Sequence, residues 1–339
     1  MDRAGLAQLL QQFGISADIT RITPHITYNG LDQQPPAYKL VAGLSFEGHP
    51  SLVIKCLKEE RTNAAYLREQ YLLSSLFLRH GIPTARRMLT PEGREQITTT
   101  HQGHQLLVTL ERDIGPEISL ATLALCRQAG ELLGRMHQIC MAEGFHMAEG
   151  RAIFDWMRES DVDAGNMLID LLQRHGRNPE SQAVRALYDA RRDMLKSRWR
   201  ALPHFAVHGD LSINNLVWGA QGELKVFDYN CAGEAPLISD AVLQALLFAR
   251  EMPYDPTQPP SSWDTRFVSF FEGYKAQRPL TEAEKSVFEP LYQAADAFWF
   301  TRYFYGDDTL DKALEEDPAL PLDGLVESIA GLLLKKPPL

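Results

Sequence analysis

The sequence predicts an α+β fold with a strand-rich N-terminal part and a mostly helical C-terminal part. Short apolar runs rich in β-branched residues recur between residues 19 and 111, and such runs are typical of strands. Further along the chain, apolar residues recur at helical spacing, as at Leu125, Ala129 and Leu132. At 339 residues the chain is long enough for two domains, and we expect them to span residues 1–113 and 114–339.

Turn and capping residues indicate where the elements of the N-terminal part begin and end. Gly14 ends a weakly helical segment, and Thr62 or Asn63 is placed to cap a second helix that stops before Gly81. The expected elements of this part are a helix at 4–13, strands at 19–22, 38–46 and 51–57, a helix from 63 to 80, and a strand at 106–111. The expected helices of the C-terminal part begin near residues 119, 235, 267 and 282, with further helices within 150–200.

The composition is that of a soluble globular protein, with 45% hydrophobic and 23% charged residues. A net charge of −10 argues against nucleic acid as a partner, because duplex binding depends on basic surface. No apolar run approaches the ~18 residues of a membrane span, and the N-terminus does not resemble a signal peptide. We therefore expect a cytoplasmic protein with no membrane partner. Four scattered cysteines indicate neither a metal cage nor a disulfide framework, and the oligomeric state stays open.

The most informative stretch contains a His-Gly-Asp tripeptide that ends at Asp210, with Asn215 five residues later. A short strand at 216–218, a glycine-flanked turn and a returning strand at 223–227 follow, and the second strand ends at Asp228. Such a hairpin would bring Asp228 back beside Asp210 and Asn215. An Asp in front of a turn often only caps backbone amides. The three residues together favour phosphoryl transfer, in which one carboxylate orients the attacking hydroxyl and an Asn and an Asp bind Mg²⁺.

This spacing resembles the H-R-D-x-x-x-x-N and D-F-G motifs of protein kinases, with Gly209 in place of the Arg and Asp-Tyr-Asn in place of Asp-Phe-Gly. In its H-G-D form the sequence is similar to the aminoglycoside phosphotransferase and choline kinase-like family, over about residues 19–305. The resemblance implies a two-lobed protein-kinase-like fold. Its N-lobe, residues 1–113, would bind the nucleotide, and its C-lobe, residues 114–339, would carry the catalytic loop and bind the acceptor.

The resemblance also implies an activity, which is transfer of the γ-phosphoryl group of ATP, or less commonly GTP, to a hydroxyl of a small molecule with the help of Mg²⁺. Asp210 would be the general base or orienting carboxylate. Asn215 and Asp228 would be the metal ligands, and His208 would be structural. A protein Ser/Thr kinase of the same fold and a catalytically silent nucleotide-binding scaffold are the alternatives. A hydrolase is disfavoured because neither G-x-S-x-G nor H-E-x-x-H occurs.

Two charged residues of the N-terminal part match the nucleotide site of this family. The run that ends at Lys55 resembles the third kinase strand, whose Lys contacts the nucleotide phosphates, and Glu69 on the following helix would be its ionic partner. Each is alternatively a solvated charge on a strand end or a helix. The phosphate-covering loop would fall near residues 27–30, although Gly30 is the only glycine there.

The remaining implied contacts lie around the hinge and the catalytic loop. Backbone groups from Thr109 to Glu111 would meet the adenine. On the helix that follows, His137 is expected to be a core or buttressing residue and not a metal ligand. Asp240 resembles a family carboxylate that braces the catalytic loop.

Acidic residues near an aromatic run at 298–305 suggest a pocket for a cationic or amine-bearing acceptor, because aromatic faces and carboxylates both attract cations. The alternative is that solvated acids surround a buried aromatic core. The acidic residues are Asp161, Asp163, Asp296, Asp307 and Asp308.

Overall fold

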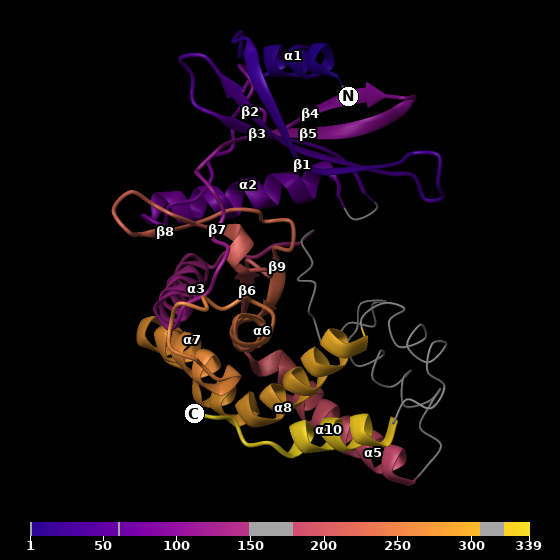
Figure 1. Cartoon of the computed structure of the whole chain (residues 1–339), viewed down its shortest axis with the longest axis vertical. Helices are drawn as coiled ribbons and strands as arrows, with labels where there is room; N and C mark the ends of the chain where they lie inside the picture. Colours follow the sequence, from indigo (N-terminus) through magenta and orange to yellow (C-terminus); the bar gives the residue numbers. More distant parts are fainter. Residues whose placement is uncertain (1, 60–61, 149–178, 306–321) are drawn as a thin grey trace. The chain divides into compact units, whose positions relative to one another are not determined.

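The computed structural model describes residues 2–59, 62–148, 179–305 and 322–339 (Figure 1). Its contacts divide the chain into two compact units. The N-terminal unit comprises Met1–Pro116 with Val217–Asn230, and the C-terminal unit comprises Glu117–Leu216 with Cys231–Leu339. The predicted α+β class, with strands concentrated in the first part and helices in the second, is confirmed. The roles assigned to the two parts stay predictions.

The N-terminal unit is built on a five-stranded antiparallel sheet with the strand order β1-β2-β3-β5-β4. Apolar residues alternate along its strands, and one face of the sheet forms a continuous hydrophobic core. The strands are β1 (Ile19–Gly30), β2 (Ala37–Phe46), β3 (Leu52–Lys58), β4 (Ile97–His101) and β5 (His104–Arg112).

The two faces of this sheet carry different side chains. Ile54 and Cys56 of β3 point into the core that they share with Leu9 and Leu10 of helix α1 (Arg3–Gln12). Lys55 lies between them in sequence and therefore points to the opposite face. Figure 1 shows α1 on one side of the sheet and α2 (Ala64–Arg79) on the other. The alternation thus places a buried Lys on the face away from α1.

Residues 27–30, where we expected a loop, instead form the end of β1. Tyr28 pairs with Lys39 and Gly30 pairs with Ala37 in the register with β2, so the chain turns only after Gly30. Thr27 and Tyr28 are good strand residues, and pairing with β2 outweighs the local turn signal of Asn29-Gly30. The expectation of a loop at these residues was therefore wrong.

The predicted hairpin is confirmed, as strands β7 (Leu216–Trp218) and β8 (Leu224–Val226). Its second strand is tied to the segment that follows α2. The Val226 amide donates to the carbonyl of Pro83 at 3.1 Å, and the Ala85 amide donates to the carbonyl of Val226 at 3.3 Å. These bonds explain why residues 217–230 belong to the N-terminal unit although they lie about a hundred residues after its main segment.

Helices form most of the described C-terminal unit, together with a two-stranded sheet of β6 (His204–Val207) and β9 (Gly233–Pro236). Helices α3 and α7 pack closely because glycines line their contact, and a Cβ at Gly130 would lie 1.9 Å from the Phe270 carbonyl oxygen. The helices are α3 (Leu123–Glu143), α5 (Pro179–Arg198), α6 (Leu237–Arg250), α7 (Trp263–Gln277), α8 (Glu282–Tyr305) and α10 (Leu322–Leu334). Within the described ranges, none of the helices has the length and apolarity that crossing a membrane requires.

Candidate active site

Lys55 and Asp228, two of the predicted site residues, are in contact within the N-terminal unit. The Nζ atom of Lys55 lies 3.0 Å from Oδ1 of Asp228. Lys55 is buried, whereas the Asp228 side chain is 28% exposed. The carboxylate therefore keeps access to solvent while it neutralises a lysine that has almost none.

A second carboxylate approaches Lys55 along the sheet. Lys55 on β3 pairs with Thr109 on β5, and Glu111 lies two residues further on, so all three side chains are on one face. Oε2 of Glu111 is 3.6 Å from Lys55 Nζ. We expected residues 109–111 to contribute backbone groups at a hinge, and that role stays a prediction. The ion pair of the Glu111 side chain was not expected.

Glu111 is also bound by Arg87, which the sequence analysis did not single out. Arg87 forms an isolated antiparallel bridge with Glu111, and its Nη2 and Nε atoms lie 2.9 Å and 3.1 Å from Oε1 of Glu111. Both residues are buried. The four side chains thus form a row in which the charge alternates, from Arg87 through Glu111 and Lys55 to Asp228. No local pattern marks Arg87, because its partner is 24 residues away in sequence.

The charge row keeps Lys55 protonated. Burial by itself would lower the pKa of Lys55, but the carboxylates of Asp228 and Glu111 outweigh burial and raise that pKa above its ordinary value. Lys55 is therefore cationic at neutral pH, which is the state that a contact with phosphate oxygens requires.

Glu69, the expected partner of Lys55, is half-buried on α2. In the described part of the chain, the ion pairs of Lys55 are with Glu111 and Asp228. The pairing of Lys55 with Glu69 stays a prediction. Two further polar atoms on this side of the sheet, Nη1 of Arg87 and Oγ1 of Thr109, are buried and have no hydrogen-bond partner among the described residues.

The backbone at Asp228 is in the left-handed region, with φ at 59°. Residues other than glycine adopt this conformation at a cost, and it is often found at functional sites. The flanking residues hold it there. The Tyr229 hydroxyl is 2.8 Å from Oγ1 of Thr84, and the Tyr66 hydroxyl donates to the carbonyl of Asn230 at 2.6 Å.

The residues of the predicted catalytic loop, 208–215, lie in the C-terminal unit. Nδ2 of Asn215 donates to the Asp210 carbonyl oxygen at 2.9 Å and to its Oδ2 at 3.1 Å, so these two predicted residues are brought together. Gly209 has φ at 80°, and a Cβ there would lie 2.0 Å from the Cys231 carbonyl oxygen. The glycine of the His-Gly-Asp tripeptide is therefore a steric requirement. The predicted convergence of Asp228 with Asp210 and Asn215 stays a prediction.

A buried hydrogen-bond chain supports the residue after Asp210. The Leu211 amide donates to Oε1 of Gln244 at 2.9 Å, and Nε2 of Gln244 donates to Oδ1 of Asp240 at 3.0 Å. Nε2 of His137 lies 3.0 Å from Oδ2 of Asp240. The structure therefore links Asp240 to the loop through Gln244, and His137 is a buried polar residue in contact with Asp240.

Asp296 does not contribute charge to an open pocket. It is completely buried on α8 and paired with Arg250 of α6. Burial raises the pKa of Asp296, although the Arg250 guanidinium opposes that effect. The interpretation of Asp296 as part of an acidic acceptor pocket is therefore wrong. The other four acidic residues, and the side chains of the aromatic run at 298–305, lie outside the described residues.

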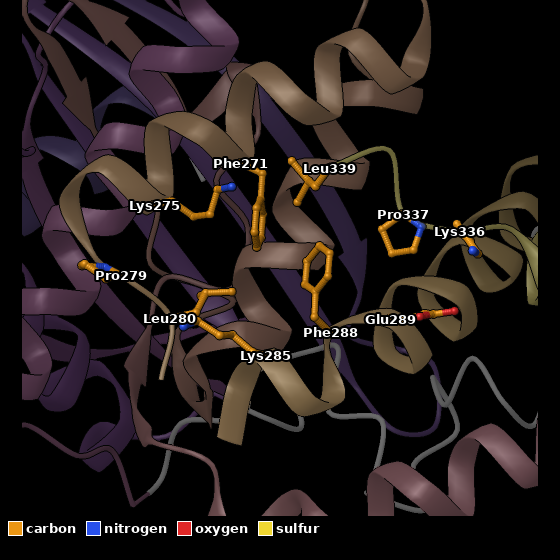
Figure 2. Close-up of a pocket in the computed structure, with 10 residues that line it drawn as sticks. All are labelled: Phe271, Lys275, Pro279, Leu280, Lys285, Phe288, Glu289, Lys336, Pro337 and Leu339. Atoms are coloured by element: carbon orange, nitrogen blue, oxygen red, sulfur yellow. The ribbon is translucent and has the colours of Figure 1, made fainter. Parts of the chain in front are cut away.

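A cavity of about 680 Å³ in the C-terminal unit contains none of the predicted site residues (Figure 2). It opens beside the end of α7 and the start of α8, and the chain after α10 covers another side. Its lining residues are Phe271, Lys275, Pro279, Leu280, Lys285, Phe288, Glu289, Lys336, Pro337 and Leu339. Lys275 and Lys285 are already paired with Glu272 and Glu282. We do not assign the catalytic chemistry to this cavity.

The strand-rich and helical units, together with the motif residues that each of them positions, define the chain as a kinase-like phosphotransferase of small molecules. In agreement, residues 80–280 match the model of the phosphotransferase enzyme family, and the chain belongs to that family. Its members include aminoglycoside phosphotransferases, so the predicted family is confirmed. The protein is accordingly a phosphotransferase with an alcohol group as acceptor.

Solved structures of similar fold include an amicoumacin kinase in complex with AMP-PNP, Ca²⁺ and Ami. It has 17% sequence identity and a TM-score of 0.61, and the match covers 100% of this chain and 97% of the other. A microcompartment-associated aminopropanol kinase is similar at 15% identity and a TM-score of 0.62, with 98% and 95% coverage. An aminoglycoside phosphotransferase from Alicyclobacillus acidocaldarius has 13% identity, a TM-score of 0.56, and 96% and 95% coverage. No curated protein matches the sequence.

Proposed function

We propose that the protein is a cytoplasmic enzyme that transfers the γ-phosphoryl group of ATP to a hydroxyl of a small molecule, with Mg²⁺ bound. The contact between Lys55 and Asp228 carries this proposal. A buried, protonated lysine is suited to bind phosphate oxygens. The partly exposed carboxylate beside it is the one that the sequence motif marks as a metal ligand.

The chemistry of the donor atoms suits Mg²⁺, which prefers oxygen ligands and is usually held by one or two protein side chains together with substrate phosphates. Asn215 uses its Nδ2 atom to donate to Asp210, which leaves the amide oxygen as its acceptor atom. Asp228 provides carboxylate oxygens. We assign these two residues as the protein ligands of Mg²⁺, which would offset the negative charge of the phosphates.

The proposed step needs only one proton acceptor. The oxygen of the acceptor hydroxyl attacks the γ-phosphorus, the bond from that phosphorus to the bridging oxygen of ADP breaks, and the hydroxyl loses its proton with the help of Asp210. Asn215 donates to Oδ2 of Asp210 and so fixes the orientation of that carboxylate. Lys55 would hold the phosphates, and backbone groups from Thr109 to Glu111 would meet the adenine.

We further propose that the acceptor is an alcohol that also bears an amine. One of the similar structures is named for an aminopropanol, and a net charge of −10 favours the approach of cations. Of the acidic residues first considered for this pocket, Asp296 is excluded by its burial. The proposal now depends on Asp161, Asp163, Asp307 and Asp308.

The test is a thermal-unfolding titration with ATP and Mg²⁺, followed by an ADP-release assay over amino alcohols, aminoglycosides, sugars and a casein-like protein. Wild-type protein should be stabilised by ATP only when Mg²⁺ is present, and Asp228→Ala should lose that effect while it still unfolds cooperatively without nucleotide. An Asp228→Ala variant that Mg²⁺ and ATP stabilise as strongly as wild type would contradict the site. ADP release with the casein-like protein alone would favour a protein kinase.

A further inference from the structure

We propose that Glu111 is a positioning residue for Lys55, and that Arg87 in turn holds Glu111. Glu111 would anchor the lysine from the β5 side of the sheet while the lysine binds the nucleotide. This inference rests on the proposed function, because it concerns the same lysine. It goes beyond that function by assigning a role to two side chains, neither of which belongs to the catalytic motifs.

The two oxygens of Glu111 are divided between two cations. Both contacts from Arg87, through Nη2 and Nε, are to Oε1, and the contact from Lys55 is to Oε2. The arginine therefore holds one oxygen of the carboxylate and leaves the other oxygen to Lys55. Main-chain hydrogen bonds also hold the segment that carries the arginine against β5. The Met88 amide donates to the Leu110 carbonyl at 2.7 Å, and the Arg112 amide donates to the Arg86 carbonyl at 2.9 Å.

Glu111 has a role that Asp228 alone cannot fill. Asp228 is the proposed metal ligand, and a carboxylate that coordinates a cation offers less charge to Lys55. Glu111 is buried and Arg87 neutralises part of its charge, but one oxygen remains directed to the lysine. Lys55 would therefore keep an anionic partner with Asp228 serving as a metal ligand. Without Glu111, the buried cations Arg87 and Lys55 would lose the carboxylate that lies between them.

The same unit contains a second carboxylate of similar burial that lacks this connection. Glu95 is 8% exposed, close to the 7% of Glu111, and it is bound by Arg68 at 3.2 Å. Its ion pair in the described structure is with Arg68 and not with Lys55. Glu95→Gln thus removes a buried carboxylate from an arginine whose side chain is 60% exposed, and leaves the surroundings of Lys55 intact.

The experiment is calorimetric titration of the full chain with ATP in the presence of Mg²⁺. For Glu111→Gln we expect the Kd to rise roughly tenfold or more, because truncating one partner of a buried charge pair is costly, with a stoichiometry that stays close to one. Loss of folded protein would instead lower the stoichiometry at constant Kd. Glu111→Asp should recover part of the affinity, and Glu95→Gln should bind as wild type does.

Two double variants separate positioning from simple destabilisation. Arg87→Met with Glu111→Gln leaves no unpaired arginine, so recovery of wild-type Kd in this variant would show that Glu111 matters only to Arg87 and would overturn the inference. It also keeps the test valid if Glu111→Gln alone does not fold. In a Lys55→Met background, Glu111→Gln should change Kd little, because both belong to one interaction.

The outcomes distinguish this inference from the proposed function. If Glu111→Gln binds ATP with the wild-type Kd while Lys55→Met binds it poorly, the role of Glu111 is wrong and the proposed nucleotide site is retained. Wild-type Kd in Lys55→Met would overturn both.

Discussion

The two units stabilise their motif residues in different ways. Around Lys55, buried side chains of alternating charge are linked by ion pairs, and the last of them, Asp228, is partly exposed. Around Asp210, a chain of buried hydrogen bonds ends on a backbone amide, that of Leu211. Ion pairs can exchange partners when a charged ligand arrives, whereas a satisfied hydrogen-bond chain fixes one geometry. We infer that the first network responds to the nucleotide and that the second fixes the loop.

In the hydrogen-bond network behind Asp210, each group can be assigned as a donor or an acceptor, which is consistent with a single fixed geometry. Arg278 donates to the Tyr274 hydroxyl at 2.9 Å, and that hydroxyl can then donate to Nδ1 of His137, 3.0 Å away. Nε2 of His137 then donates to Asp240. Burial lowers the pKa of His137, although Asp240 opposes this, and the neutral ring that results has one donor and one acceptor, as the chain requires.

The largest expected effect is the loss of turnover in Asp210→Asn, a change near the second network that should leave ATP binding at the first network intact. Asp210→Asn removes the charge that we propose orients the acceptor hydroxyl, and it keeps the shape of the side chain. Turnover should therefore fall by about 10²–10⁴, the usual contribution of general-base help, while the Kd for ATP stays near wild type. Calorimetry and the ADP-release rate give the two values. Wild-type turnover would remove Asp210 from the mechanism, and lost ATP binding would make it a metal ligand.

A smaller effect is expected from Gln244→Ala, which leaves the Leu211 amide without its partner. The free energy of unfolding should fall by about 1–3 kcal/mol, as for other buried groups left unpaired. Turnover should fall about tenfold or more because the loop that carries Asp210 is less well positioned. Chemical denaturation and the ADP-release assay measure the two effects.

Gln293→Ala is the matched control for Gln244→Ala. Gln293 is equally buried in the same unit and accepts a hydrogen bond from Arg191 at 2.7 Å. The control should lose stability and keep its turnover under folding conditions. Equal losses of turnover in both variants would show that Gln244 contributes only to stability.

The smallest expected effect concerns the acceptor. If an amine-bearing alcohol is attracted by exposed acids, its KM should rise a few-fold with added salt, since screening shortens the reach of charges to a Debye length of ~8–10 Å. The KM for ATP should change less, because Lys55 is buried. Steady-state assays over a salt series provide both values. A neutral sugar as the best acceptor, with no salt effect, would exclude the cationic acceptor.

The residues of the site that the sequence predicted are those that belong to local patterns. Lys55 ends a strand-like run, and Asp210, Asn215 and Asp228 lie within a stretch of 25 residues, 206–230, so local spacing and its resemblance to kinase motifs were enough to predict them. The hairpin that ends at Asp228 was predictable for the same reason, because alternating apolar residues and flanking glycines are local signals.

The parts that were missed depend on contacts between distant residues. The contact of Glu111 with Lys55 follows from the register of β3 and β5, and that of Glu111 with Arg87 from an isolated bridge to β5. No local pattern encodes either of them. Asp296 had the sequence context of an exposed acid beside aromatic residues, and only its pairing with Arg250 shows that it is part of the core.

The most direct test of the account is phosphorus NMR of wild-type protein with ATP, Mg²⁺ and the acceptor that gives the fastest ADP release. The account predicts that the γ-phosphate signal disappears while a phosphomonoester signal and ADP appear in equal amounts, and that Lys55→Met and Asp228→Ala strongly slow both. Inorganic phosphate as the only new product, or no change in the γ-phosphate signal over the whole acceptor panel, would contradict it.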